Sequence, residues 1–158
     1  MTFKEQVQAV TRTVQHSKGS HLVELTQTFP FEPAAAWDAL TSPEAMVQWF
    51  DVLSGDLEEG GDYELTGSQH SGTIKTCRPR QSLEVTWEYG EDVSNVSLNL
   101  TPTGSGTALT LVHAATADEH WETFGPAATG TGMVPATPWF FTCGAIRTRT
   151  RRRWPNCQ

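Results

Sequence analysis

The sequence predicts an α+β domain in which an antiparallel sheet is covered on one face by helices. Two observations indicate this class. Between residues 60 and 114 apolar and polar residues alternate in short segments separated by glycine turns, which is typical of antiparallel strands with one buried face. Two short helical segments precede this region and a helix-like segment follows it. A chain of 158 residues that is 37% hydrophobic supports one core of normal size.

Six segments show the period-two alternation of half-buried strands. The clearest is SLEVTWEYG, where Leu83, Val85, Trp87 and Tyr89 share one face. The connections between segments are short and polar, as antiparallel hairpins require. The six segments are residues 21–29, 60–67, 72–79, 82–90, 93–102 and 107–114.

Two short helices are expected after the first strand, each beginning at a proline. Pro33 and Pro43 suit the first helical position, and Ser42 offers an N-cap hydroxyl to the second helix. Each helix spans about two turns, below the roughly 12–15 residues that an isolated helix needs in water. Trp37 and Trp49 are therefore expected to hold the helices on the sheet by their burial.

Two motifs connect this layout with a known family. They are WDALTSPE, residues 37–44, and PRQSLEVTWE, residues 79–88; the segments GGDYELTG, VSLNLTPTGSGTALTLVHA and HWETFGPAATGTG support them. The chain resembles the helix-grip fold of the START and birch-pollen-allergen superfamily. More narrowly, it resembles the SRPBCC, AHSA-type homologues of the C-terminal domain of the heat-shock-protein-90 ATPase activator. The resemblance implies a curved antiparallel sheet, two short helices after the first strand, a C-terminal helix, and a cavity between sheet and helices.

We divide the chain into a polar N-terminal segment (1–19), a helix-grip domain (20–132) and an atypical tail (133–158). The first segment is expected to be one loose helix or strand. Relatives continue after the position of Gly132 into a long amphipathic helix. In this tail, prolines interrupt any helical pattern, and the sequence ends in an arginine-rich segment. We hypothesise that the tail is disordered or results from a frame error in a G+C-rich gene, which resequencing would test. If the closing helix is missing, exposed apolar surface favours a homodimer.

Charge and composition restrict the partners and the compartment. The net charge is −7, and up to residue 146 six basic and eighteen acidic side chains give −12. An acidic body repels phosphate, so neither nucleic acid nor membrane is expected as a partner. The three cysteines form no C-x-x-C pair, so no disulfide framework or zinc site is predicted. Because the N-terminus lacks a signal-like apolar run, we expect a cytoplasmic protein.

Seven residues are candidates for contact with a ligand in the implied cavity. Five occupy inward strand positions, and two lie at the end of the second helix. His113 shares strand parity with Leu109 and Leu111, and a buried imidazole needs a hydrogen-bond partner or a ligand. Core packing remains the alternative for His113 and for Trp49. The candidates are Trp49, Phe50, Tyr63, Thr76, Trp87, Tyr89 and His113.

The sequence contains little that indicates catalysis. It has no G-x-S-x-G motif, and its five histidines lack metal-ligand spacing on a predicted element. We therefore predict no catalytic residue, metal or cofactor, and a non-catalytic domain that binds a small hydrophobic molecule. Two alternatives remain open: a chaperone-regulating module for heat-shock protein 90, implied by the resemblance, and a polyketide-cyclase-like or hydrolase enzyme that depends on Tyr63 or His113.

Overall fold

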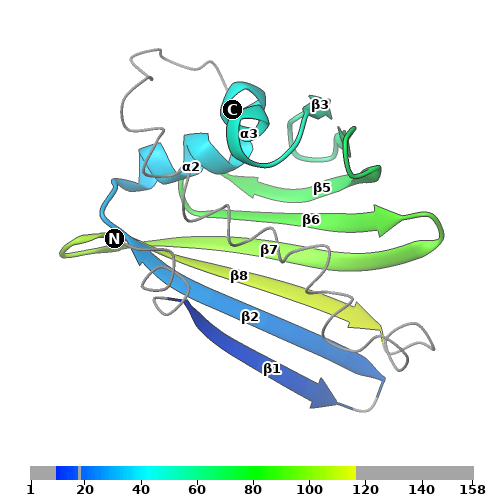
Figure 1. Cartoon of the computed structure of the whole chain (residues 1–158), viewed down its shortest axis with the longest axis horizontal. Coiled ribbons are helices and arrows are strands. Elements are labelled where there is room, and N and C mark those ends of the chain that lie inside the picture. The colour runs from blue at the N-terminus through cyan, green and yellow to red at the C-terminus, as the bar shows by residue number, and fades with distance from the viewer. Residues whose placement is uncertain (1–9, 18, 117–158) are drawn as a thin grey trace.

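The computed structural model describes residues 10–17 and 19–116, which form an eight-stranded sheet with two helices over one of its faces (Figure 1). The strand order is β1-β2-β8-β7-β6-β5-β4-β3, and all neighbouring strands are antiparallel. The strands are β1 (Thr11–Ser17), β2 (Ser20–Phe29), β3 (Leu53–Gly55), β4 (Asp62–Leu65), β5 (His70–Arg78), β6 (Ser82–Tyr89), β7 (Asp92–Thr103) and β8 (Gly106–Thr116). The predicted α+β, helix-grip arrangement is thus confirmed. The expected C-terminal helix (118–132) and the tail (133–158) lie outside the described residues.

The segment before residue 20 contributes a strand to the sheet. β1 pairs with β2 in continuous register from Thr11 opposite Thr26 to Ser17 opposite Ser20. Of the helix or strand expected there, the strand is what forms in residues 11–17. β1 is one edge of the sheet, and the short β3 is the other.

The two predicted helices are present as α2 (Pro33–Thr41) and α3 (Pro43–Trp49), and each begins at its proline. Ser42 ends α2 in an extended conformation, which a residue before proline prefers. Its hydroxyl caps α3 by accepting a hydrogen bond from the N–H of Ala45 at 3.1 Å. No helix in the described residues is long and apolar enough to cross a membrane.

The core lies between the helices and the curved face of the sheet. Alternate strand residues point into it, as the sequence pattern predicts, because successive side chains of a strand leave opposite faces. The least exposed apolar side chain is that of Leu65 in β4, at 1%. Buried core residues from the helices and strands include Phe29, Trp37, Leu40, Met46, Trp49, Ile74, Val85, Val96, Leu100, Leu109 and Leu111.

β5 contains a bulge that reverses the predicted orientation of its second half. Ile74 pairs with Val85 on the inner face, but the register then shifts, and Thr76 pairs with Glu84. The extra residue of a bulge places the following side chains on opposite faces from those that strict alternation gives. The inward position predicted for Thr76 is therefore wrong, and Cys77 takes the inward position instead.

Candidate functional site

A cavity of about 450 Å³ lies between the curved face of the sheet and the helix pair. This volume is within the range of about 300–1,000 Å³ that is usual for small-molecule sites. Inward residues of β2, β8, β7 and β6 form its floor, and α2 and α3 form its roof. The floor is largely aliphatic and includes Leu25, Leu83, Val85, Leu98, Leu109 and Leu111.

A row of leucines crosses the cavity floor perpendicular to the strands. Leu83 of β6 pairs with Leu98 of β7, which pairs with Leu111 of β8, which in turn pairs with Leu25 of β2. The bulge in β5 adds Cys77 to the end of the same row, opposite Leu83. A continuous apolar floor of this kind favours an apolar occupant.

The roof is fixed by a hydrogen bond between the two helices. The indole Nε1–H of Trp49 donates to the carbonyl oxygen of Ala39 at 2.8 Å, and the contact is buried. Pro43, four residues after Ala39, has no N–H to offer that carbonyl. Trp49 therefore supplies the donor that the end of α2 lacks.

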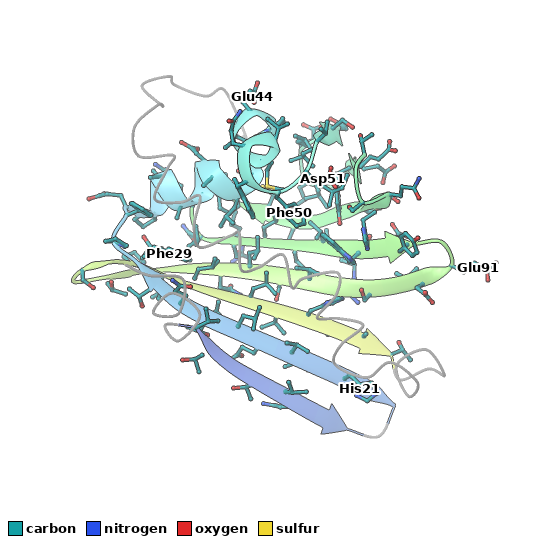
Figure 2. All side chains as sticks on the ribbon, in the orientation of Figure 1. His21, Phe29, Glu44, Phe50, Asp51 and Glu91 are labelled. Atoms are coloured by element: carbon teal, nitrogen blue, oxygen red, sulfur yellow. The ribbon has the colours of Figure 1, made fainter. Side chains whose placement is uncertain are left out.

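Aromatic rings continue from the roof to the sheet. Phe50 points from the end of α3 toward the strands (Figure 2), and its ring lies 5.3 Å from that of Trp49 and 6.5 Å from that of Trp87 between centroids. His70 extends the row, at 4.9 Å from Trp87 and 5.1 Å from Tyr89. These spacings are typical of offset or tilted ring contacts. Of this row, Trp49, Phe50 and Trp87 line the cavity.

The structure brings four of the seven candidate residues together around the cavity and leaves three outside it. Those that line it are Trp49, Phe50, Tyr63 and Trp87. Those that do not are Thr76, Tyr89 and His113. Thr76 lies beyond the bulge of β5, and Tyr89 is 53% exposed at the end of β6. Whether the seven residues contact a ligand stays a prediction.

The hydroxyl of Tyr63 is already engaged within the protein. It donates to the carbonyl oxygen of Thr86 at 2.6 Å. Burial, and secondarily the charge of Glu88, raises the pKa of Tyr63 above its usual range. The phenol therefore stays protonated and bound to the backbone, and its ring rather than its hydroxyl faces the cavity.

His113 is buried in the sheet next to the cavity. It is 6% exposed and lies between Val23 of β2 and Val96 of β7. Its Nε2 is 2.6 Å from the hydroxyl oxygen of Ser94, whereas its Nδ1 has no hydrogen-bond partner among the described residues. Burial, with a smaller contribution from nearby His70, lowers the pKa of His113 to about 4. The imidazole is therefore neutral at physiological pH.

Two polar residues at this site were not named as candidates from the sequence. His70 was assigned to a polar connection, although it shares parity with Ile74 and begins β5. Burial lowers the pKa of His70, against opposing effects of Ser68 and Asp51. Gln27 lines the cavity from β2; the alternation placed it inward, but nothing in the sequence marked it as more than a strand residue.

Asp51 fixes the turn that carries His70. Its carboxylate accepts backbone hydrogen bonds from Val52 at 2.7 Å and from Gly67 and Ser68 at 2.8 Å each. Burial alone would raise the pKa of Asp51, but the hydrogen bond from the Ser68 side chain and these backbone hydrogen bonds outweigh it and hold the pKa below its usual value. The charged carboxylate thus ties the end of α3 to the β4–β5 turn.

Asp38 and Arg80 line the cavity where α2 approaches the β5–β6 turn. Burial raises the pKa of Asp38, and the positive charge of Arg80 partly offsets this effect. Within the described ranges, no group of three histidine, cysteine, aspartate or glutamate side chains is arranged to hold a metal ion.

Comparison with known proteins gives one family and several similar structures. The family model for activator of Hsp90 ATPase homolog 1-like proteins matches residues 30–134. The crystal structure of CalU16 from Micromonospora echinospora is 30% identical with a TM-score of 0.69, and the similarity covers 84% of this chain and 83% of CalU16. A solution structure of CalU16 has 28% identity and a TM-score of 0.71, covering 90% and 77% of the two chains.

An Hsp90 activator from Plasmodium falciparum shares the fold at lower similarity. It is 18% identical with a TM-score of 0.54, and the match covers 61% of this chain and 74% of the activator. No curated protein matches the chain.

Proposed function

The chain belongs to the family of activator of Hsp90 ATPase homolog 1-like proteins, and on this premise we propose that it is a non-catalytic domain that holds a small hydrophobic molecule between sheet and helices. The observation that carries the proposal is the cavity of about 450 Å³ with its leucine-rich floor and aromatic roof. A void of this size lined by apolar groups favours an apolar occupant over water. Trp49, Phe50, Tyr63 and Trp87 are the proposed ring contacts.

Native mass spectrometry of freshly purified protein tests this proposal. We expect a retained small molecule, seen as a mass excess that disappears on denaturation. The matched variants are Leu98→Trp, which fills the cavity floor, and Asn99→Trp, which adds the same ring to the exposed outer face of β7. Only Leu98→Trp should lose the bound mass. Equal retention by both variants would place the molecule elsewhere and contradict the proposal; the same spectra report whether the protein is the expected homodimer.

The family description favours a chaperone-regulating module as the second candidate. Such a module would act through its outer surface, and Glu64 and Glu84 are exposed there, on the opposite side of the sheet from the inward residues of β4 and β6. Copurification with a heat-shock-90 homologue that is lost on Glu64→Lys and Glu84→Lys, but kept in Leu98→Trp, would favour this function. The reverse pattern would favour ligand binding.

An enzyme of cyclase or hydrolase type is the third candidate, and it needs a group able to transfer protons. The hydroxyl of Tyr63 donates a hydrogen bond to a backbone carbonyl and has a raised pKa, and His113 lies outside the cavity lining. These features support a non-catalytic role. An enzyme would lose turnover in Tyr63→Phe, whereas we expect this variant to keep the bound molecule.

A further inference from the structure

Gln27 places a polar amide in an otherwise apolar part of the cavity. It lies on the inner face of β2, lines the cavity and is 9% exposed. Its partner across β2 and β8 is Leu109, and the next residue in the same row is Leu100 of β7. The amide therefore stands in an aliphatic row that a leucine or methionine would continue.

The side-chain oxygen of Gln27 is buried and has no hydrogen-bond partner among the described residues. An unsatisfied buried acceptor destabilises the folded state, because it has lost its bonds to water without replacement. Folding alone would thus favour an apolar side chain at this position. The amide is best explained by a partner other than the described residues, and the cavity that it lines is where a ligand could supply one.

Four hydroxyl groups of the cavity wall already have partners. The hydroxyl of Thr41 donates to the carbonyl of Trp37, that of Ser42 caps α3, and that of Tyr63 donates to a backbone carbonyl. Thr26 is 3.3 Å from Thr110 between their hydroxyl oxygens. Of the buried side-chain atoms that have no partner among the described residues, the oxygen of Gln27 is the one that belongs to a residue lining the cavity.

We infer that Gln27 recognises the ligand, and that this ligand is a mainly apolar molecule carrying a hydroxyl group, an alcohol or phenol, that donates a hydrogen bond to the Gln27 side-chain oxygen. The inference rests on the proposed function and narrows its ligand class. A hydroxyl suits the site because it can both donate and accept. It can therefore donate to the side-chain oxygen of Gln27 or accept from its side-chain N–H, so it bonds the amide in either of the amide's two orientations. The aliphatic row around Gln27 contacts the apolar body.

Two probes of nearly equal shape test this assignment: 2-naphthol, which has the hydroxyl, and 2-methylnaphthalene, which has a methyl group in its place. Their dissociation constants are measured by isothermal titration calorimetry with the full chain and with Gln27→Met. Because the two probes have nearly equal shape, a change in cavity size caused by Gln27→Met affects both dissociation constants alike and cancels in their ratio. The two probes differ in hydration, but this difference is the same for both proteins and cancels when the two ratios are compared. We expect Gln27→Met to weaken the binding of 2-naphthol about tenfold relative to that of 2-methylnaphthalene, because only 2-naphthol loses a buried hydrogen bond.

Thr28→Val is the matched control, since Thr28 follows Gln27 on the exposed outer face of β2. It should leave the ratio unchanged. Without any probe, Gln27→Met should unfold at the same or a higher urea concentration than the wild type, because it removes an unsatisfied acceptor.

The possible results separate the inference from the proposed function. If both probes bind and Gln27→Met leaves their ratio unchanged, the role of Gln27 is refuted while cavity binding stands. A clear loss of stability in probe-free Gln27→Met would show that the folded chain itself uses the amide, and would also refute the role. If neither probe binds the wild type, the proposed function fails and the ligand class fails with it.

Discussion

Replacing Trp49 by phenylalanine should weaken the attachment of the helix pair to the sheet. The indole N–H of Trp49 donates to the carbonyl of Ala39 in a buried contact of 2.8 Å. Phenylalanine keeps an aromatic ring but has no donor, so the carbonyl loses this bond in a place that water does not reach. Neither helix is long enough to be stable alone, so the two should loosen together.

The magnitude follows from two effects. Leaving a buried carbonyl without its donor costs about 1–3 kcal/mol. The smaller ring leaves a void on the order of 40 Å³, which at about 24 cal/mol per Å³ adds about 1 kcal/mol. Together, Trp49→Phe should lower the free energy of unfolding by about 2–4 kcal/mol, a large part of the roughly 5–15 kcal/mol of a typical domain.

Urea unfolding followed by far-ultraviolet circular dichroism measures this loss without depending on tryptophan emission. The matched control is Val47→Ala, because Val47 is on the exposed face of α3 at 49% exposure. It should change the free energy of unfolding by less than about 0.5 kcal/mol. A Trp49→Phe protein as stable as this control would refute the idea that Trp49 joins the two helices.

Three further predictions concern the sheet and the polar residues near it. Gly72→Ala should lower stability by about 1–3 kcal/mol, because its Cβ would overlap the carbonyl of Thr86. Lowering the pH from 6.5 to 4 should reduce stability by about 3 kcal/mol, since the unfolded chain protonates His113 near pH 6.5 and the folded protein only near pH 4. Asp51→Asn should cost about 1 kcal/mol and accelerate amide exchange in the β4–β5 turn, because its backbone hydrogen bonds lose their charged acceptor.

Each of these predictions has a control. Gly104→Ala should be nearly neutral, because nothing lies within 4 Å of the added Cβ. His113→Gln, which can keep the bond to Ser94, should flatten the pH dependence of urea unfolding; an unchanged slope would assign it to other groups. Asp62→Asn removes another exposed carboxylate, and equal exchange rates in the two aspartate variants would contradict the role of Asp51.

Local patterns in the sequence predicted most of the elements and their inner faces. Period-two alternation placed Leu83, Val85 and Trp87 correctly, because a paired strand without a bulge can only alternate. It failed at Thr76, because a bulge depends on pairing with β6 and leaves no signature in a single strand. The same limit applied to His70, where polar neighbours hid the start of β5.

The candidate site was predicted only in part, for a related physical reason. Trp49, Phe50, Tyr63 and Trp87 line the cavity, because large apolar side chains of the helices and of inward strand positions meet there, and their contact with a ligand stays a prediction. Tyr89 shares their parity but lies where the strand leaves the core, and it is exposed. The alternation along a strand gives the face of the sheet on which a side chain lies, whereas the burial of that side chain depends on what covers the face.

The sequence alone determined the class of the fold, six of the eight described strands and both described helices, because these depend on periodicity, turn residues and caps within short stretches of chain. The family followed from the resemblance of two motifs, WDALTSPE and PRQSLEVTWE, to known relatives. The tertiary structure decided which inward residues share one cavity, which hydroxyls are already bonded, and which buried amide oxygen has no partner among the described residues. Those properties depend on distances between strands and helices far apart in the chain, such as the bond from Trp49 to Ala39 and the unfilled acceptor of Gln27. No pattern along a single segment encodes them.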